Sequence, residues 1–152
     1  MPFESTRRPV LTKLLTELEK IHPVTARTKI YELRSGTGQV ALFLAKNTPA
    51  QIIGVEKNWP LYFFSRVKKE FSRSSHQIKY LNQDLFTVDL TPATIVYTYF
   101  SPQAYQKAQS KFEQELESGT IFVAWRYPFR SSHFKLLTTI KDRHTMYLYQ
   151  KR

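Results

Sequence analysis

One stretch limits the possible folds more than any other: residues 29–40, KIYELRSGTGQV, which read as a strand, a turn with two glycines and the start of an apolar helix. A strand that enters a helix through glycines presents free backbone N–H groups at the positive end of the helix dipole. Such a turn suits an anionic or nucleotide-like ligand. Eighteen positions after Gly38, Glu56 closes a second apolar run, where a carboxylate can accept hydrogen bonds from ribose hydroxyls. Arg34 departs from the pattern, because it stands where a first glycine is expected.

Length and composition predict one α/β domain over residues 1–152, since 41% of the residues are hydrophobic. No apolar run reaches the ~18 residues of a transmembrane segment, and the first eight residues lack the apolar core of a secretory signal. Cysteine is absent, which excludes disulfides, thiolate zinc sites and cysteine nucleophiles. We therefore expect a soluble, cytoplasmic protein.

The chain is strongly basic, with a formal net charge of +11. Such an excess favours acidic partners: nucleic acid, an anionic membrane face or an acidic protein. The basic residues are spread along the chain, so solvated faces are the alternative interpretation. The histidines lack metal-ligand spacing, and no metal site is expected from them: His22, His76, His133 and His144.

Hydrophobic periodicity predicts alternating helices and strands. A first helix is expected over 9–21, with Ser5 or Thr6 as its cap and Pro9 in its first turn. The expected strands are 29–33, 51–56, 78–82, 95–100 and 120–125, and the later helices are 39–46, about 60–71 capped by Asn58, and 102–117. The runs 134–140 and 145–150 are close enough to pair as an antiparallel hairpin. The order predicts a Rossmann-like three-layer α/β/α sandwich with a mostly parallel sheet and a C-terminal antiparallel hairpin.

A five-stranded parallel sheet followed by a hairpin is the layout of the class I S-adenosylmethionine (AdoMet) methyltransferases, and short motifs extend the resemblance. Residues 32–38, ELRSGTG, resemble the superfamily's acidic-Leu-Gly-x-Gly-x-Gly motif, with its first glycine replaced. Residues 54–56, GVE, resemble the acidic strand end that binds ribose. Residues 83–86, QDLF, resemble the segment that contacts adenine.

Three further segments are similar to one branch of that superfamily, the small protein-lysine methyltransferases of archaea and mitochondria. They are residues 2–6, PFEST, followed by an apolar helix; residues 84–96, which link two strands; and residues 97–102, YTYFSP. This branch includes the enzyme that modifies the c-ring protein of ATP synthase. The resemblance implies an AdoMet-dependent methyltransferase that acts on a protein lysine.

The resemblance also implies a set of site residues. Glu32 would hold the amino end of the methionine moiety, Glu56 the ribose, and Asp84 the adenine, although a loop aspartate also commonly caps a turn. The expected cofactor residues are Glu32, Arg34, Ser35, Gly36, Gly38, Glu56, Lys57, Asp84 and Leu85.

Methyl transfer from a sulfonium needs a neutral nucleophile held in line more than it needs a strong acid or base. Tyr99 is the candidate that positions the acceptor, and with Phe100 it could flank a lysine ammonium by cation–π contact. Sheet core is the competing role, above all for Phe100. The expected substrate cleft consists of Tyr97, Phe100, Ser101, Trp125 and Tyr127.

The sequence leaves the role of Arg34 open. Its side chain either turns outward, or pairs with a carboxylate of the ligand, or blocks the pocket. A blocked pocket would make the chain a non-catalytic binding module whose basic surface engages nucleic acid or acidic protein. An RNA methyltransferase is a further alternative, although YFSP differs from the Asn/Asp-Pro-Pro-aromatic sequence of many base-N-methyltransferases.

Overall fold

The computed structural model describes residues 6–152, and its elements follow the predicted order. Ser5 and the motif residues 2–5 lie outside the described residues. The helices are α1 (Arg8–Ile21), α2 (Gln39–Asn47), α3 (Trp59–Glu70), the short 3₁₀ helix η1 (Ser75–Gln77) and α4 (Pro102–Glu115). The strands are β1 (Lys29–Leu33), β2 (Gln51–Val55), β3 (Ile78–Leu81), β4 (Ile95–Thr98), β5 (Ile121–Trp125), β6 (Phe134–Lys141) and β7 (Thr145–Lys151).

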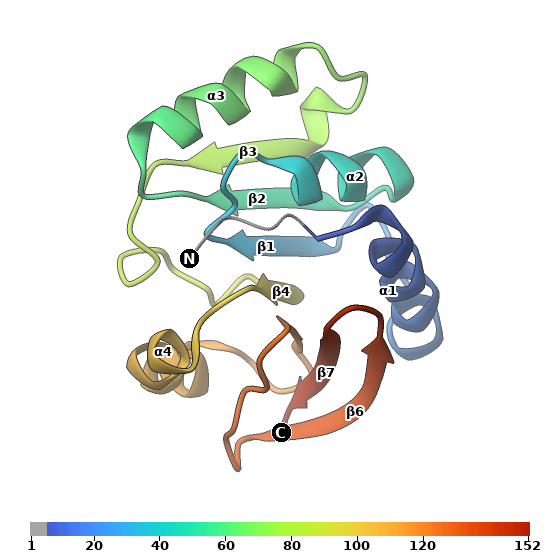
Figure 1. The fold of residues 1–152 in the computed structure, drawn as a ribbon, viewed down its shortest axis with the longest axis vertical. Helices are drawn as coiled ribbons and strands as arrows, with labels where there is room; N and C mark the ends of the chain where they lie inside the picture. The colour runs from blue at the N-terminus through green and yellow to red at the C-terminus, as the bar shows by residue number, and fades with distance from the viewer. Residues whose placement is uncertain (1–5) are drawn as a thin grey trace.

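The strands form one sheet in the order β3-β2-β1-β4-β5-β7-β6 (Figure 1). The first five strands are parallel, whereas β7 runs antiparallel between β5 and β6. The predicted Rossmann-like sandwich with a C-terminal antiparallel hairpin is confirmed. Strand β4 is shorter than predicted, since it ends at Thr98, so Tyr99 and Phe100 lie beyond the regular strand.

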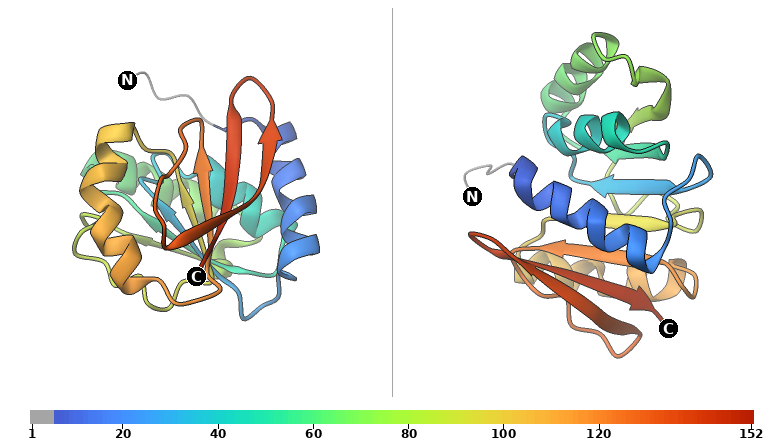
Figure 2. Two further views of the ribbon diagram at one scale, coloured as in Figure 1. Left: turned by 90° about the horizontal axis from the view of Figure 1, so that it is seen from below. Right: turned by 90° about the vertical axis from the view of Figure 1, so that its right-hand side faces the viewer.

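Helices α1, α2 and α3 cover one face of the sheet, and α4 covers the other (Figure 2). On the first face, apolar residues at helical spacing in α1 and α2 pack on the sheet. On the second face, α4 shares its core with the loop between β3 and β4, through residues such as Leu85 and Leu90. Each face of the sheet therefore has its own apolar core, and the sequence runs of the central strands are buried on both sides.

The start of α1 differs from the prediction. The residue at the N-cap is Arg7, which makes no side-chain cap hydrogen bond, while Pro9 lies in the first turn as expected. The Thr6 hydroxyl instead hydrogen-bonds the phenol of Tyr97 at the end of β4. The capping prediction for Thr6 is wrong because a buried phenol, distant in sequence, is its partner.

The order of strands reverses beside β1. The chain moves from β1 outward to β2 and β3, then crosses to β4 on the other side of β1. In open α/β sheets a ligand binds at this switch point, outside the carboxyl ends of the strands. Here that position lies between the turn after Leu33 and the residues after Thr98. In residues 6–152, no helix is both long and apolar enough to cross a membrane.

Candidate active site

The turn after β1 has a left-handed backbone at three positions. The φ angles are 60° at Arg34, 57° at Gly36 and 80° at Gly38. The Ser35 N–H donates to the Val55 carbonyl at 3.0 Å, which ties the turn to β2. Gly38 is the N-cap of α2 and supplies no side-chain cap, so the first N–H groups of α2 face the turn without a side-chain acceptor from the cap residue.

Two buried side chains that the sequence did not single out support this turn. The Ser65 hydroxyl of α3 donates to the Gly36 carbonyl at 2.8 Å. The phenol of Tyr80 on β3 lies beneath Gly38 and Gly54, so a Cβ at Gly38 would collide with its hydroxyl, and one at Gly54 would lie 2.5 Å from its Cδ1. These glycines are needed for close approach to Tyr80. No local signal identifies Tyr80 or Ser65, because their roles depend on strand and helix packing.

Glu56 follows β2 and holds the turn from the other side. One carboxylate oxygen accepts from the Gly36 N–H and the other from the Asn58 N–H, both at 2.9 Å, and the residue is only 8% exposed. Each oxygen retains further acceptor capacity. The carboxylate is therefore fixed at the predicted ribose position, oriented by backbone donors.

Glu32 is a buried carboxyl on β1, beneath the turn. Burial raises its pKa to about 8, the Ala41 backbone N–H partly offsets this, and the charge of Glu56 adds to the rise. Its Oε2 has no hydrogen-bond partner within the described residues. A cationic ligand group beside Glu32 would favour its ionised form.

The predicted adenine end contains Asp84, Lys57 and Leu85. The Asp84 carboxylate accepts from the Phe86 N–H at 3.0 Å and pairs with the Lys57 ammonium at 3.3 Å. These contacts lower the pKa of Asp84, with the Phe86 hydrogen bond as the main cause. Asp84 is thus a turn cap, and its ion pair joins the loops after β2 and β3. Leu85 is buried in the apolar core on the α4 side.

Arg34 lies across the switch point. Its side chain is exposed, and the guanidinium carbon lies 4.7 Å from the centre of the Phe100 ring, which is itself 1% exposed. Of the outcomes left open by the sequence, the structure shows a left-handed backbone that preserves the turn and a side chain that stacks across the loops after β1 and β4.

The predicted acceptor residues divide into two groups. Tyr97 is buried in the core on the α1 side, and Tyr99 packs against the same core. The Arg126 Nη1 donates to the Tyr99 hydroxyl at 3.1 Å, and the Arg126 guanidinium carbon lies 5.2 Å from the Tyr127 ring centre. Arg126 therefore joins Tyr99 and Tyr127, a contact that strand periodicity did not indicate.

The other cleft residues have structural contacts. Trp125 is buried on the α1 side, whereas Tyr127 packs on the α4 side, so the prediction of one shared cleft for both is wrong. The cause is Arg126, whose φ of 76° ends the alternation of β5. Ser101 caps α4 through the Ala104 N–H, and Phe100 belongs to the aromatic core beneath α4.

The turn carries polar atoms that fit a bound AdoMet molecule. Within the described residues, four buried side-chain polar atoms have no hydrogen-bond partner, and three of them belong to this segment: Glu32 Oε2, Ser35 Oγ and Thr37 Oγ1. Unpaired buried groups are costly and are commonly explained by a ligand or water. Together with the Glu56 carboxylate and the α2 amino end, they form a donor and acceptor set of the kind that a nucleoside with an amino-acid tail requires.

Comparison with known proteins agrees with this site. A model of the ANTKMT methyltransferase domain matches residues 32–135, from Glu32 through Tyr127 and beyond. A protein-lysine N-methyltransferase of Saccharolobus islandicus is 25% identical over 98% of this chain and 92% of its own length. The mouse lysine N-methyltransferase that acts on the c-ring protein of ATP synthase is 30% identical over 68% of this chain but only 41% of its own length.

Among solved structures, an RNA methyltransferase from Salinibacter ruber in complex with S-adenosyl-L-homocysteine superposes with a TM-score of 0.86. It covers 97% of this chain and 94% of the other at 23% identity, a similarity that supports the fold. The family model includes the strand, the turn and the residues after β2 and β4 that form the site. The chain therefore belongs to the ANTKMT methyltransferase domain family and is an AdoMet-dependent methyltransferase.

Proposed function

We propose that this protein transfers the methyl group of AdoMet to a lysine side chain of another protein. The observation that carries the proposal is the family match over residues 32–135. The names of the archaeal and mouse relatives, both lysine methyltransferases, support a lysine acceptor.

The proposed cofactor residues surround the turn after β1. The Glu56 carboxylate, held by the Gly36 and Asn58 N–H groups, accepts the ribose hydroxyls. Glu32 lies where it pairs with the methionine ammonium, and Asp84 with Lys57 borders the adenine. Residues Ser35, Gly36 and Gly38 shape the loop, and Arg34 covers it from the Phe100 side.

The acceptor lysine would enter beside Tyr99, in the loop after β4. The Tyr99 hydroxyl is fixed by Arg126, so the phenol has a defined direction. The Arg126 cation next to Tyr99 disfavours a second cation there, which lowers the pKa of an entering lysine. A neutral amine is the form that can attack.

AdoMet supplies an electrophilic methyl group on a sulfonium. The lysine lone pair forms the new N–C bond while the C–S bond breaks, and the amine proton passes to solvent. The chain orients the amine and excludes alternative approaches, which is the main contribution that an in-line displacement needs. Tyr97 does not act as a base, because burial raises its pKa well above the ordinary value and its phenol is bonded to Thr6.

Two experiments test the proposal in sequence. Isothermal titration with S-adenosylhomocysteine measures the cofactor site, where we expect Glu56→Ala to weaken binding at least tenfold, since a charge-assisted contact contributes about 1.5–3 kcal/mol. Glu70→Ala, an exposed acid at the end of α3, is the matched control. Absence of binding by the unaltered protein at millimolar ligand would contradict the cofactor assignment.

The acceptor is identified by incubation with labelled AdoMet and a cell lysate. We expect the label to be sensitive to protease, resistant to nuclease and recovered as methyl-lysine after acid hydrolysis. A nuclease-sensitive label would identify RNA as the acceptor instead and overturn the lysine assignment. Tyr99→Phe in the same assay tests whether the phenol that Arg126 holds is needed to align the acceptor.

A further inference from the structure

Helix α3 turns its apolar face toward solvent. Its buried side is marked by Ser65, which is fully buried, whereas the large apolar residues are exposed. The exposed fractions are 59% for Trp59, 52% for Phe63, 52% for Phe64, 43% for Val67 and 87% for Phe71. At 3.6 residues per turn these five residues share a sector about 140° wide, opposite Ser65. An ordinary surface helix has the reverse orientation.

The exposed face, which we call the α3 aromatic face (Trp59, Phe63, Phe64, Val67, Phe71), is large. Roughly 500 Å² of apolar surface is exposed, since an aromatic side chain carries about 150–250 Å². The Trp59 and Phe63 rings stack at 5.3 Å, so the patch is ordered. Helix α3 lies at the outermost β3 edge of the molecule (Figure 1), and contiguous exposed patches of this size mark interaction sites.

The surroundings of this face are cationic. Between positions 57 and 73 the chain has five cations and one acid, Glu70. Arg66 lies over the Tyr62 ring at 5.7 Å, and the Lys68 ammonium reaches the Thr37 carbonyl at 3.4 Å. The cations are therefore held beside the helix. A partner that covers the α3 aromatic face must be anionic as well as apolar.

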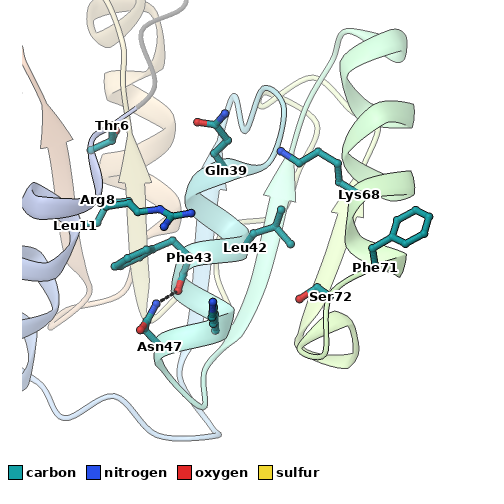
Figure 3. Close-up of a pocket in the computed structure, with 11 residues that line it drawn as sticks. Thr6, Arg8, Leu11, Gln39, Leu42, Phe43, Asn47, Lys68, Phe71 and Ser72 are labelled. Carbon is teal, nitrogen blue, oxygen red and sulfur yellow. Dashed lines mark hydrogen bonds between the residues drawn. The ribbon is translucent and has the colours of Figure 1, made fainter.

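A pocket continues the surface toward α1 and α2. Its volume is about 660 Å³, and the residues around it combine apolar side chains with cations. Its charged lining residues are Arg8, Lys46 and Lys68, all positive. Figure 3 shows Lys68 directed toward α2, while the Phe71 ring points away from it at the outer rim. Phe71 and Lys68 thus belong both to the pocket and to the region of the exposed face.

A second copy of the chain does not suit this surface, because a symmetric contact would bring the cations of two α3 helices together. The face is also convex, since it is one side of a single outer helix. A helix with exposed tryptophan and phenylalanine flanked by Lys and Arg is the type that lies in a membrane interface and is attracted to anionic lipid. Trp and Phe insert at the headgroup level while lysine stems extend to the phosphates.

We propose that the α3 aromatic face docks the protein on an anionic lipid bilayer, with the aromatic side chains inserted at the interface and the neighbouring cations on lipid phosphates. The docking is peripheral and independent of the methyl-transfer chemistry. It places α3 in the membrane plane, with the amino end of the helix, next to Glu56, at the site edge of the sheet.

Flotation of the full chain with vesicles tests the proposal. The probes are vesicles of phosphatidylcholine alone and vesicles with about one-third phosphatidylserine. We expect at least tenfold stronger partition onto the anionic vesicles, with about a fivefold loss for each cation removed by Arg66→Gln or Arg73→Gln, and a loss at high salt. The double variant Phe63→Ser and Phe71→Ser is expected to lose at least about tenfold in partition to the same vesicles.

Tryptophan emission gives a second readout. The chain has two tryptophans: Trp59 is 59% exposed and Trp125 is 3% exposed, so only Trp59 can change its environment on docking. We expect a shift to shorter wavelength with anionic vesicles that disappears in Trp59→Phe. Leu136→Ser and Lys135→Gln on β6, the opposite edge of the sheet, are matched controls that keep full partition.

Equal partition of the unaltered protein and the Phe63 and Phe71 double variant would overturn the proposal. So would a sedimentation result in which the same double variant abolishes a dimer of the unaltered chain, since the face would then cover a second copy. Binding of S-adenosylhomocysteine is measured on every variant and is expected to be unchanged. A loss of vesicle binding is thereby separated from any failure of the methyltransferase site.

Discussion

The guanidinium carbon of Arg34 lies 4.7 Å from the centre of the Phe100 ring, so one residue from the turn after β1 covers the residue that follows β4. The two loops meet at the point where the strand order reverses. Arg34 keeps the left-handed backbone that a glycine would adopt, with a φ of 60°. The substitution therefore preserves the shape of the turn and adds a cation–π contact to it.

The first prediction compares two replacements of Arg34. Arg34→Gly loses a contact of about 0.5–1 kcal/mol but relieves a left-handed penalty of about 1 kcal/mol, so the free energy of unfolding should change by less than about 1 kcal/mol. Arg34→Ala loses the contact and keeps the penalty, and should be about 1 kcal/mol less stable than the glycine variant. Urea unfolding measures both. Equal stability of the two variants would show that the backbone at this position is unstrained.

The second prediction concerns pH and Glu32. Its folded-state pKa of about 8 exceeds the unfolded value near 4.5, so the folded protein holds an extra proton between these values. The stability that this group contributes is full below about pH 4.5 and is lost as the pH rises through about 8. Glu32→Gln cannot ionise and should be about 3 kcal/mol more stable than the unaltered protein at pH 9, with little difference at pH 5. Unfolding in urea at pH 5, 7 and 9 measures this, with exposed Glu70→Gln as control; parallel profiles for the unaltered protein and Glu32→Gln would refute it.

The third prediction separates two roles of glycine. Gly38 and Gly119 both have positive φ, but a Cβ at Gly38 meets the Tyr80 hydroxyl whereas one at Gly119 meets nothing within 4 Å. Gly119→Ala should cost about 1 kcal/mol from the backbone alone, and Gly38→Ala about 1–3 kcal/mol more from overpacking. Tyr80→Phe in the Gly38→Ala background should recover part of that loss, because it removes the nearest atom. Thermal unfolding of the four variants decides the matter.

The fourth prediction assigns a positioning role to Arg126. Arg126→Gln removes a cation beside Tyr99, so a bound acceptor lysine keeps its proton to higher pH, and the acidic limb of the kcat profile should move up by about one pH unit. Arg126→Lys retains the charge and should retain most of the limb. All three side chains share the same left-handed backbone, so a purely structural effect would lower kcat equally at every pH and leave the limb in place.

The fifth prediction tests the link between Thr6 and Tyr97. Thr6→Val leaves the buried Tyr97 hydroxyl without its partner and should destabilise the fold by about 1–3 kcal/mol. Adding Tyr97→Phe removes both polar groups, and the double variant should regain a large part of the loss. A double-mutant cycle measures the coupling energy, and additive effects of the two substitutions would argue against the contact.

The sequence alone determined the elements whose signals are local. The glycine turn, the apolar runs of the strands, Pro9 in the first turn of α1 and the Asn58 cap of α3 all depend on near neighbours in the chain. The position of Glu56 at the end of β2 followed from the same local pattern. These features led to the correct sheet and family because alternating strands and helices have few allowed arrangements.

Only the tertiary structure decided which side chains meet across elements. Tyr80 and Ser65 support the turn from β3 and α3, and Thr6 bonds Tyr97 across 91 positions instead of capping its own helix. Period-two alternation would place Trp125 and Tyr127 on one face, but the left-handed backbone at Arg126 puts them on opposite sides of the sheet.

For the opening turn, the sequence established that an arginine occupies a glycine position. It could not establish where that side chain goes, because its direction depends on Phe100, which β4 brings beside β1 from 66 positions away. Local patterns specify the backbone of the site, whereas long-range packing of strands that are distant in sequence specifies the contacts that its side chains make.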